Sequence, residues 1–251
     1  MNILVTGGAG FIGSHLIDSL ILEEHQVTCI DNLSLGSKDN LNFAFFSKKF
    51  DFFEIDLNNK KELSKIFKSH DFDFVYHMAA NSDISKGTSL PETDLKNTFL
   101  STVSILNAMR EYEVNNIFFP STSAVYGDTK NKIIEQTNKI PISQYGSAKL
   151  ASESFLSSYS YLYGFNVWIL RLANIIGTRS THGVLYDFIK KLKKDKNNLH
   201  VLGNGTQSKP YLHISDLIDC IHFIIRNSKL KFNEFNVTSK DTISVKDIAK
   251  E

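Results

Sequence analysis

The chain of 251 residues is 42% hydrophobic and 22% charged, a composition typical of a folded globular protein. This composition excludes a disordered chain, a collagen-like chain and a coiled coil, and the length allows one large domain or a domain with an added lobe. With 28 basic and 27 acidic side chains the formal net charge is +1, which gives no electrostatic reason to expect nucleic acid or an anionic membrane as a partner.

Short β-branched runs alternate with longer helical periods over the first 170 residues or so. We expect strands at 3–5, 27–30, 52–55, 73–77, 116–120 and 167–170. We expect helices at 11–22, 60–68, 95–111 and 144–163. This alternation predicts right-handed βαβ units around a parallel sheet, and strands that are apolar on both sides indicate helices on both faces.

The pattern changes after about residue 176. A helix is expected at 184–193, short strands near 200–202 and 211–212, a helix at 216–226 and a strand at 235–237. The chain therefore divides into a predicted domain over 1–175 and a smaller C-terminal lobe over 176–251. A further helix begins at Val245 and the sequence stops at Glu251, so we expect this lobe to be incomplete.

Cysteine and histidine usage argues against disulfide and metal chemistry. Cys29 and Cys220 are too few for a disulfide scaffold, and the histidines lack metal-ligand spacing, so no metal is expected. No apolar run approaches the roughly 20 residues of a membrane-spanning helix, and no signal peptide precedes the first strand. We expect a cytoplasmic protein without a membrane partner.

The first predicted strand leads into a glycine-rich loop and then a helix. Gly7, Gly10 and Gly13 have the spacing that permits a tight turn, close approach of a pyrophosphate and close packing of helix on strand. Asp31 ends the second strand, where a carboxylate binds the adenosine ribose and repels a 2′-phosphate, which favours NAD over NADP. The alternative is a glycine-rich turn with a capping aspartate. Together these features predict a doubly wound α/β fold of the Rossmann type.

Six segments in one order resemble a known family. They resemble the extended short-chain dehydrogenase/reductases, in particular the NAD-dependent nucleotide-sugar epimerase/dehydratase group, with the strongest resemblance to UDP-glucose (UDP-galactose) 4-epimerases. The segments are Thr6-Gly-Gly-Ala-Gly-Phe-Ile-Gly13, Asp31-Asn32-Leu33, His77-Met-Ala-Ala80, Ser121-Thr-Ser-Ala-Val-Tyr-Gly127, Tyr145-Gly-Ser-Ala-Lys149 and Arg171-Leu-Ala-Asn-Ile-Ile-Gly177.

The resemblance implies NAD as cofactor and a set of residues in contact with it. This set is Gly7, Gly10, Phe11, Ile12, Gly13, Asp31, Asn32, Leu33, Ser34, Asp56, Leu57, Ala79 and Lys149. For Asp56 the alternative is a role as N-cap of the helix that begins at residue 60.

Tyr145 and Lys149 are four residues apart and therefore share one face of the predicted helix. A free tyrosine titrates near 10, so an adjacent ammonium and the positive nicotinamide ring are expected to lower its pKa. The resemblance implies that Tyr145 is the catalytic base, supported by Lys149, and that Thr122 hydrogen-bonds the sugar hydroxyl. The alternative is a core tyrosine with a solvated lysine. Ser121 and Ser123 are expected mainly to hydrogen-bond the loop backbone.

Ser123 and Ala124 follow Thr122, where the family's dehydratases carry Asp-Glu for the elimination of water. Alanine neither donates nor accepts a proton, so the sequence favours a 4-epimerase that oxidises and reduces C4 of the sugar through a keto form. The alternatives are an N-acetylhexosamine 4-epimerase, a 4-keto reductase, or a catalytically silent NAD-binding protein.

The resemblance also implies contacts with a nucleotide-sugar substrate, most readily a UDP-sugar, and a homodimer that pairs the helices at 95–111 and 144–163. The substrate set is Thr122, Ser123, Tyr145, Asn174, Val184, Val201 and Lys209. Lys209 stands where the family usually has arginine, and lysine lacks the bidentate fork. The alternatives are a surface charge for Lys209 and a turn residue for Asn174.

Overall fold

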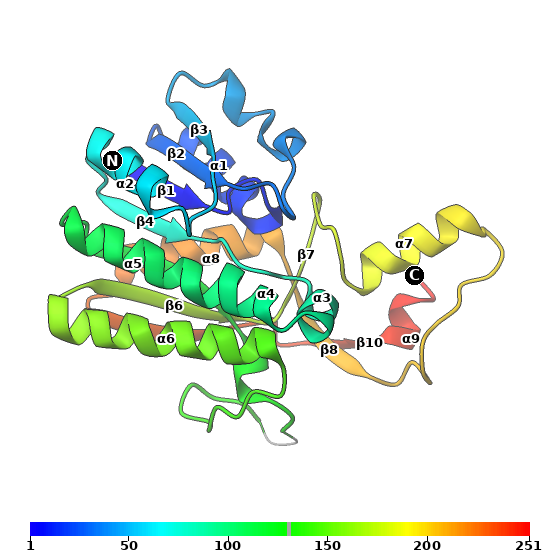
Figure 1. Ribbon diagram of the computed structural model, residues 1–251. Helices are drawn as coiled ribbons and strands as arrows, with labels where there is room; N and C mark the ends of the chain where they lie inside the picture. Colours follow the sequence, from blue (N-terminus) through cyan, green and yellow to red (C-terminus); the bar gives the residue numbers. More distant parts are fainter. Residues whose placement is uncertain (130–131) are drawn as a thin grey trace.

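The computed structural model describes residues 1–129 and 132–251, and shows a central sheet with helices on both faces (Figure 1). Within these ranges seven strands pair in the order β3-β2-β1-β4-β5-β6-β9, and every pairing is parallel. The strands are β1 (Asn2–Thr6), β2 (Gln26–Asp31), β3 (Phe50–Glu54), β4 (Phe74–His77), β5 (Asn116–Thr122), β6 (Asn166–Leu172) and β9 (Phe232–Val237). The predicted doubly wound α/β fold is confirmed.

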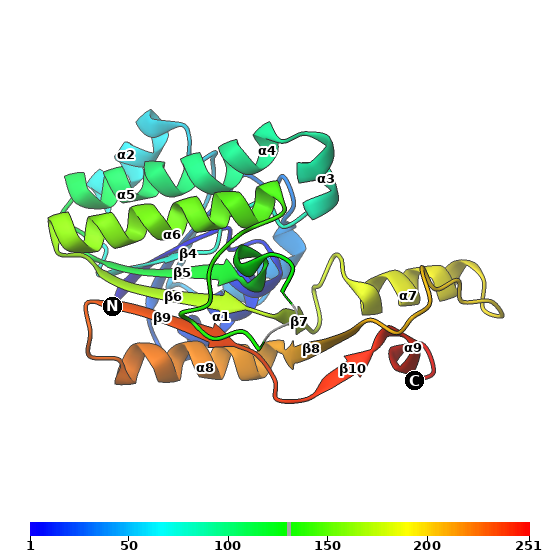
Figure 2. The same cartoon turned by 90° about the horizontal axis from the view of Figure 1, so that it is seen from below.

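Successive residues of the strands point into two separate hydrophobic cores. Ile3 and Val5 of β1 pack with α1 (Phe11–Leu22) and α8 (Ile214–Asn227), whereas Leu4 packs on the opposite face. That face is covered by α2 (Lys60–Ser69), α5 (Ser101–Glu111) and α6 (Gln144–Tyr163) (Figure 2). Full burial of such aliphatic side chains contributes about 1.5–3 kcal/mol each, so both faces stabilise the sheet.

The direction in which the sheet is built reverses between β1 and β4, which lie side by side at its centre. From β1 the chain adds β2 and β3 toward one edge, and from β4 it adds β5 and β6 toward the other. At such a switch point the connections to the helices diverge on opposite faces and leave a crevice at the carboxyl ends of the strands. The glycine loop, Asp31, Thr122 and the N-terminal turns of α6 all lie at this end of the sheet.

The residues after 173 divide between two sheets. β9 returns to the large sheet beside β6, and α8 packs on that sheet's face. A second, three-stranded sheet is formed by β7 (Asn174–Ile176), β8 (Ser208–His213) and β10 (Thr242–Ser244), with α7 (Val184–Lys194) and α9 (Val245–Ile248) nearby (Figure 1). The domain boundary between 175 and 176 stays a prediction.

The expected helix at 95–111 is interrupted. Its first part, Leu95–Leu100, is a wider π-helical turn that follows a short α4 (Glu92–Asp94), and α5 begins only at Ser101. The hydroxyls of Ser101 and Thr102 donate to the carbonyl of Thr98, at 3.1 and 2.6 Å. Such bonds compete with the regular helical pattern, which explains why the apolar periodicity alone did not reveal the turn.

The strand expected near 200–202 is not formed, and this prediction is wrong. The segment is an irregular connection, in which the carbonyl of His200 accepts a hydrogen bond from Lys191 Nζ at 2.8 Å. Its apolar residues have no neighbouring strand to pair with. Among the described residues, the elements that the sequence did not indicate include α3 (Ile84–Ser89), α4, β7 and β10.

Candidate active site

A cavity of about 1170 Å³ opens at the carboxyl ends of the large sheet and extends to α7 and β8. Most residues predicted to bind cofactor or substrate line it. They are Gly7, Gly10, Phe11, Ile12, Gly13, Asp31, Asn32, Ser34, Asp56, Leu57, Ala79, Thr122, Tyr145, Lys149, Asn174, Val184 and Lys209. Leu33, Ser123 and Val201 do not belong to the lining; beside Val201 it is Leu202 that does.

The glycine loop is shaped by contacts that leave no space for a Cβ atom. Gly7 has φ of +66°, and a Cβ there would lie 2.5 Å from the backbone nitrogen of Ala79. A Cβ on Gly13 would lie 2.5 Å from the carbonyl oxygen of Gly7. Helix α1 begins directly after Gly10 without a side-chain cap, so its N-terminal N–H groups and partial positive charge are directed to the cavity. The loop therefore fits a pyrophosphate.

Asp31 connects the glycine loop to the end of β2. Its carboxylate accepts hydrogen bonds from the backbone N–H groups of Ala9 (2.9 Å) and Leu33 (2.8 Å). Burial raises the pKa of Asp31, and these two hydrogen bonds oppose the rise. Leu33 itself has φ of 56° and packs against the core, which explains why its side chain does not reach the cavity. The acid at the strand end and the uncapped helix together fit a dinucleotide.

Asp56 is not the N-cap of α2. That position is held by Asn59, whose side chain accepts a hydrogen bond from the N–H of Glu62 at 3.3 Å. Asp56 instead accepts from the N–H of Asn58 at 2.8 Å and lines the cavity. The helix-cap alternative for Asp56 is therefore wrong.

His77 is fully buried between two threonines. Its ring nitrogens lie 2.7 Å from Thr6 Oγ1 and 3.0 Å from Thr102 Oγ1. Burial, reinforced by the charge of Lys149, lowers the pKa of His77 to about 3, so the ring is neutral at physiological pH. Its neutral ring therefore links β4 to β1 and α5.

Helix α6 presents Tyr145 and Lys149 from its first two turns. Ser143 caps the helix by accepting a hydrogen bond from the N–H of Gly146 at 3.1 Å, which fixes where these turns begin. Lys149 Nζ donates to the carbonyl of Pro120 at 2.7 Å and lies 4.4 Å from the centre of the Phe119 ring. Both contacts hold the buried ammonium against the end of β5.

Burial dominates the protonation of both side chains. It lowers the pKa of Lys149 to about 7, although the nearby carboxylates of Glu153 and Asp94 oppose the change. It raises the pKa of Tyr145 to about 12, although a hydrogen bond with Thr122 opposes the change. The expectation that Lys149 lowers the pKa of Tyr145 is not met by the residues of this chain alone, because desolvation of the phenolate is the larger effect.

Thr122 contacts both the turn that follows it and the phenol of Tyr145. Its Oγ1 accepts a hydrogen bond from the N–H of Ala124 at 3.2 Å, which caps the short turn Ser123–Tyr126. Ser121, one residue earlier, donates to Glu153 and does not bind the loop backbone as expected.

The opposite wall of the cavity comes from the second sheet and α7. Asn174 donates from Nδ2 to the carbonyl of Pro210 at 3.1 Å, which joins β7 to β8. Lys209 on β8 lines the cavity and is at the same time exposed. Sequence reasoning missed Arg179, which also lines the cavity and pairs with Asp18 at 2.7 Å. Its position just after the motif that ends at Gly177 was the available signal.

Comparison with known proteins agrees with this arrangement. Residues 3–238 match the model of the NAD dependent epimerase/dehydratase family. The chain belongs to this family. NAD is the family's cofactor, as predicted, and the glycine loop with Asp31 fits it.

Three similar proteins show how varied the family is. A Methanocaldococcus jannaschii protein named as a UDP-glucose 4-epimerase is 35% identical over 86% of this chain and 70% of its own length. An Arabidopsis thaliana protein named as a UDP-arabinose 4-epimerase is 31% identical over 98% of this chain, which spans 62% of that protein. The Bacillus cereus UDP-glucuronic acid 4-epimerase, solved with UDP-glucuronic acid and NAD, is 29% identical over 98% of this chain and 80% of its own, with a TM-score of 0.89.

No group of three or more His, Cys, Asp or Glu side chains in the described ranges is placed to hold a metal ion. Within the same ranges, no helix has both the length and the apolar character needed to cross a bilayer.

Proposed function

We propose that this chain is a nucleotide-sugar 4-epimerase that interconverts UDP-glucose and UDP-galactose. The observation that carries the proposal is the placement of Thr122, Tyr145 and Lys149 on the same cavity as the glycine loop. The turn after Thr122 holds Ser123 and Ala124, so it supplies no carboxylate for the elimination of water. Family membership and 4-epimerase relatives support the same reaction class.

The proposed mechanism assigns proton transfer to Tyr145. Its phenolic oxygen takes the proton from the 4-hydroxyl group of the sugar and returns it after the sugar has turned in the cavity. When bound, NAD supplies the acceptor and donor of the hydride at C4. Thr122 orients the 4-hydroxyl and the phenol together through its hydrogen bond with Tyr145. Since burial raises the pKa of Tyr145, the phenolate needs positive charge beside it, and Lys149 is the chain's own cation one helical turn away.

Asn174, Val184 and Lys209 form the proposed substrate side of the cavity. Lys209 offers a point charge to the diphosphate, and the start of α7 at Val184 lies on the same wall. By name, the relatives differ in the sugar of their UDP-sugar: glucose, arabinose and glucuronic acid.

The test is incubation of the purified protein with UDP-glucose, UDP-galactose and their N-acetyl forms, without added NAD, followed by identification of the products. Interconversion of the first pair is expected. If only the N-acetyl pair is converted, the reaction is the proposed 4-epimerisation, but the proposed substrate pair is wrong. Net consumption of NADH with a 4-keto sugar would identify a reductase, and no turnover of any sugar would overturn the proposal.

A further inference from the structure

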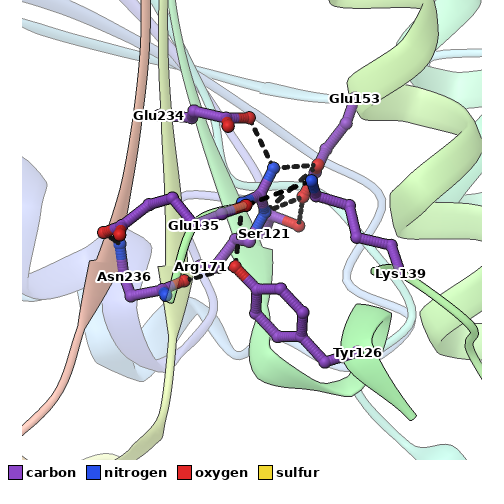
Figure 3. Close-up of polar contacts among 8 residues, drawn as sticks. All are labelled: Ser121, Tyr126, Glu135, Lys139, Glu153, Arg171, Glu234 and Asn236. Atoms are coloured by element: carbon purple, nitrogen blue, oxygen red, sulfur yellow. Dashed lines mark hydrogen bonds and ion pairs between the residues drawn. The ribbon is translucent and has the colours of Figure 1, made fainter. Parts of the chain in front are cut away.

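An ionic cluster around Arg171 joins β6, α6 and β9 (Figure 3), and none of its side chains is assigned a proton-transfer step in the proposed mechanism. At its centre is Arg171 on β6, whose side chain is 1% exposed. Its guanidinium donates to the carboxylate of Glu153 from Nε (3.0 and 3.2 Å) and from Nη2 (2.8 Å). It also donates to Glu234 on β9 at 2.6 Å and to the hydroxyl of Tyr126 at 2.9 Å. Burial opposes the charge of Arg171, but the bonds with Glu153 raise its pKa above the ordinary value.

Helix α6 contacts the end of β5 three times, at residues spaced by four. Tyr145 hydrogen-bonds Thr122, Lys149 donates to the carbonyl of Pro120, and Glu153 accepts from the hydroxyl of Ser121. Residues spaced by four lie on one face of a helix, so three successive turns of α6 meet three consecutive residues of β5. Two of these contacts belong to the proposed catalytic residues, and the third is made by Glu153.

Charged side chains from α4, α6, β6 and β9 surround Lys149 and Glu153 on this face of α6. Lys149 is approached by the carboxylates of Glu153 on α6 and Asp94 on α4, and by the neutral ring of His77 on β4. Glu153 is approached by Arg171 on β6, which in turn binds Glu234 on β9. Glu153 therefore connects the cluster to the ammonium of Lys149.

We propose that Glu153 is a positioning residue for the reaction: held by Arg171, it fixes the third contact of α6 with β5 one helical turn from Lys149. The negative charge of Glu153 at that place favours the ammonium form of Lys149. This inference rests on the proposed function of Tyr145 and Lys149. A buried carboxylate left without its partner would be costly, and Arg171 is the cation that makes its burial possible.

The direct test is the titration of Lys149 itself, observed by NMR of protein labelled with ¹³C at the lysine ε-carbon. The signal of Lys149 is assigned by its loss in Lys149→Met. In Glu153→Gln, which keeps the shape of the side chain, the pKa of Lys149 should fall by about one pH unit or more. The matched control is Glu234→Gln, which removes the carboxylate on β9 that pairs with the same guanidinium. In this control the pKa of Lys149 should fall by less than about a third of the decrease in Glu153→Gln.

A charge-balanced variant covers the case in which Glu153→Gln does not fold. Glu153→Gln combined with Arg171→Met removes both buried charges, so neither is left without its partner, and the carboxylate that acts on Lys149 is absent. The pKa of Lys149 should therefore fall in this double variant too. If Lys149 titrates as in the wild type in a folded Glu153 variant, or if Glu234→Gln lowers its pKa equally, the proposal is wrong.

Turnover gives a second readout and separates this inference from the proposed function. Loss of the Glu153 charge lowers the pKa of Lys149, so the ammonium is lost at lower pH and the alkaline limb of kcat should move to lower pH. KM near pH 6 should stay within about threefold, because Glu153 does not line the cavity. If the wild type converts no UDP-sugar, the proposed function fails, while the titration of Lys149 still decides on Glu153.

Discussion

Helix α6 positions both Tyr145 and Lys149, and desolvation opposes the charge that each carries during proton transfer. Replacing Tyr145 by phenylalanine keeps the ring and its packing but removes the ionisable oxygen. Turnover should fall by about 10² or more, the usual scale for the loss of a general base, while NAD binding is retained. Tyr159→Phe, which removes a phenol bound to Asn107 farther along α6, is the matched control and should leave turnover unchanged.

Lys149 should also cost the protein stability at low pH. Its pKa is about 7 when folded and near 10.4 in an unfolded chain, so the unfolded state binds more protons between these values and stability rises with pH across this range. Lys149→Met should therefore be more stable than the wild type at pH 6, by more than about 1 kcal/mol, with the advantage shrinking towards pH 9. Urea unfolding at both pH values measures this, with the exposed Lys65→Met as control. An advantage that does not change with pH would contradict the assignment.

At the scale of the element, the glycine loop requires glycine at Gly7 mainly because neighbouring backbone atoms leave no room for a Cβ atom, and less because of its positive φ. Gly7 and Gly203 have similar φ values of +66° and +73°, but a Cβ at Gly203 would meet no atom within 4 Å. Gly203→Ala should cost about 1 kcal/mol of stability through backbone strain and leave NAD binding intact. Gly7→Ala should abolish NAD binding, because the loop must move away from Ala79. Calorimetric titration with NAD compares the two, and equal affinities would show that strain alone matters.

The elements also show what sequence patterns can predict. The helices at 11–22 and 144–163 and the strand–glycine–helix arrangement follow from local periodicity, and the structure has them at the same residues. The π-helical turn at Leu95–Leu100 depends on the buried hydroxyls of Ser101 and Thr102, which no periodicity encodes. β7 and β10 are three residues each, and both pair with β8, which lies between them in the sheet. Such short strands depend on pairing with a segment far away in the sequence, so the local pattern did not indicate them. Most of the predicted site residues line the cavity, because the strand ends that carry them converge at one edge of the sheet. The cluster around Arg171 could not be predicted, because it depends on tertiary contacts with α6 and β9.

At the scale of the whole molecule, α5 and α6 form one face with apolar side chains left exposed. Phe155 of α6 packs edge-on against Phe99 at 5.0 Å, yet is 39% exposed, and Leu162 is 63% exposed. Because exposed apolar patches mark interaction sites, we expect a two-fold dimer that uses this face in both subunits. Light scattering at micromolar concentration should give twice the chain mass of 28.4 kDa. Leu162→Glu should shift the protein to a monomer, whereas a wild type found only as a monomer would contradict the expectation.

The position of β9 at the edge of the large sheet has a consequence for the order in which the protein forms during synthesis. Arg171 leaves the ribosome 63 residues before Glu234, its partner on β9. Until β9 emerges, the nascent chain can complete β1 to β6 but holds a guanidinium whose second carboxylate has not yet been made. Pairings of such sequence separation form slowly and late. The ion pair between Arg171 and Glu234 would thus be among the last contacts to form. Ribosome-bound chains that stop before β9 should be cut by protease around Arg171 far more readily than chains that include it.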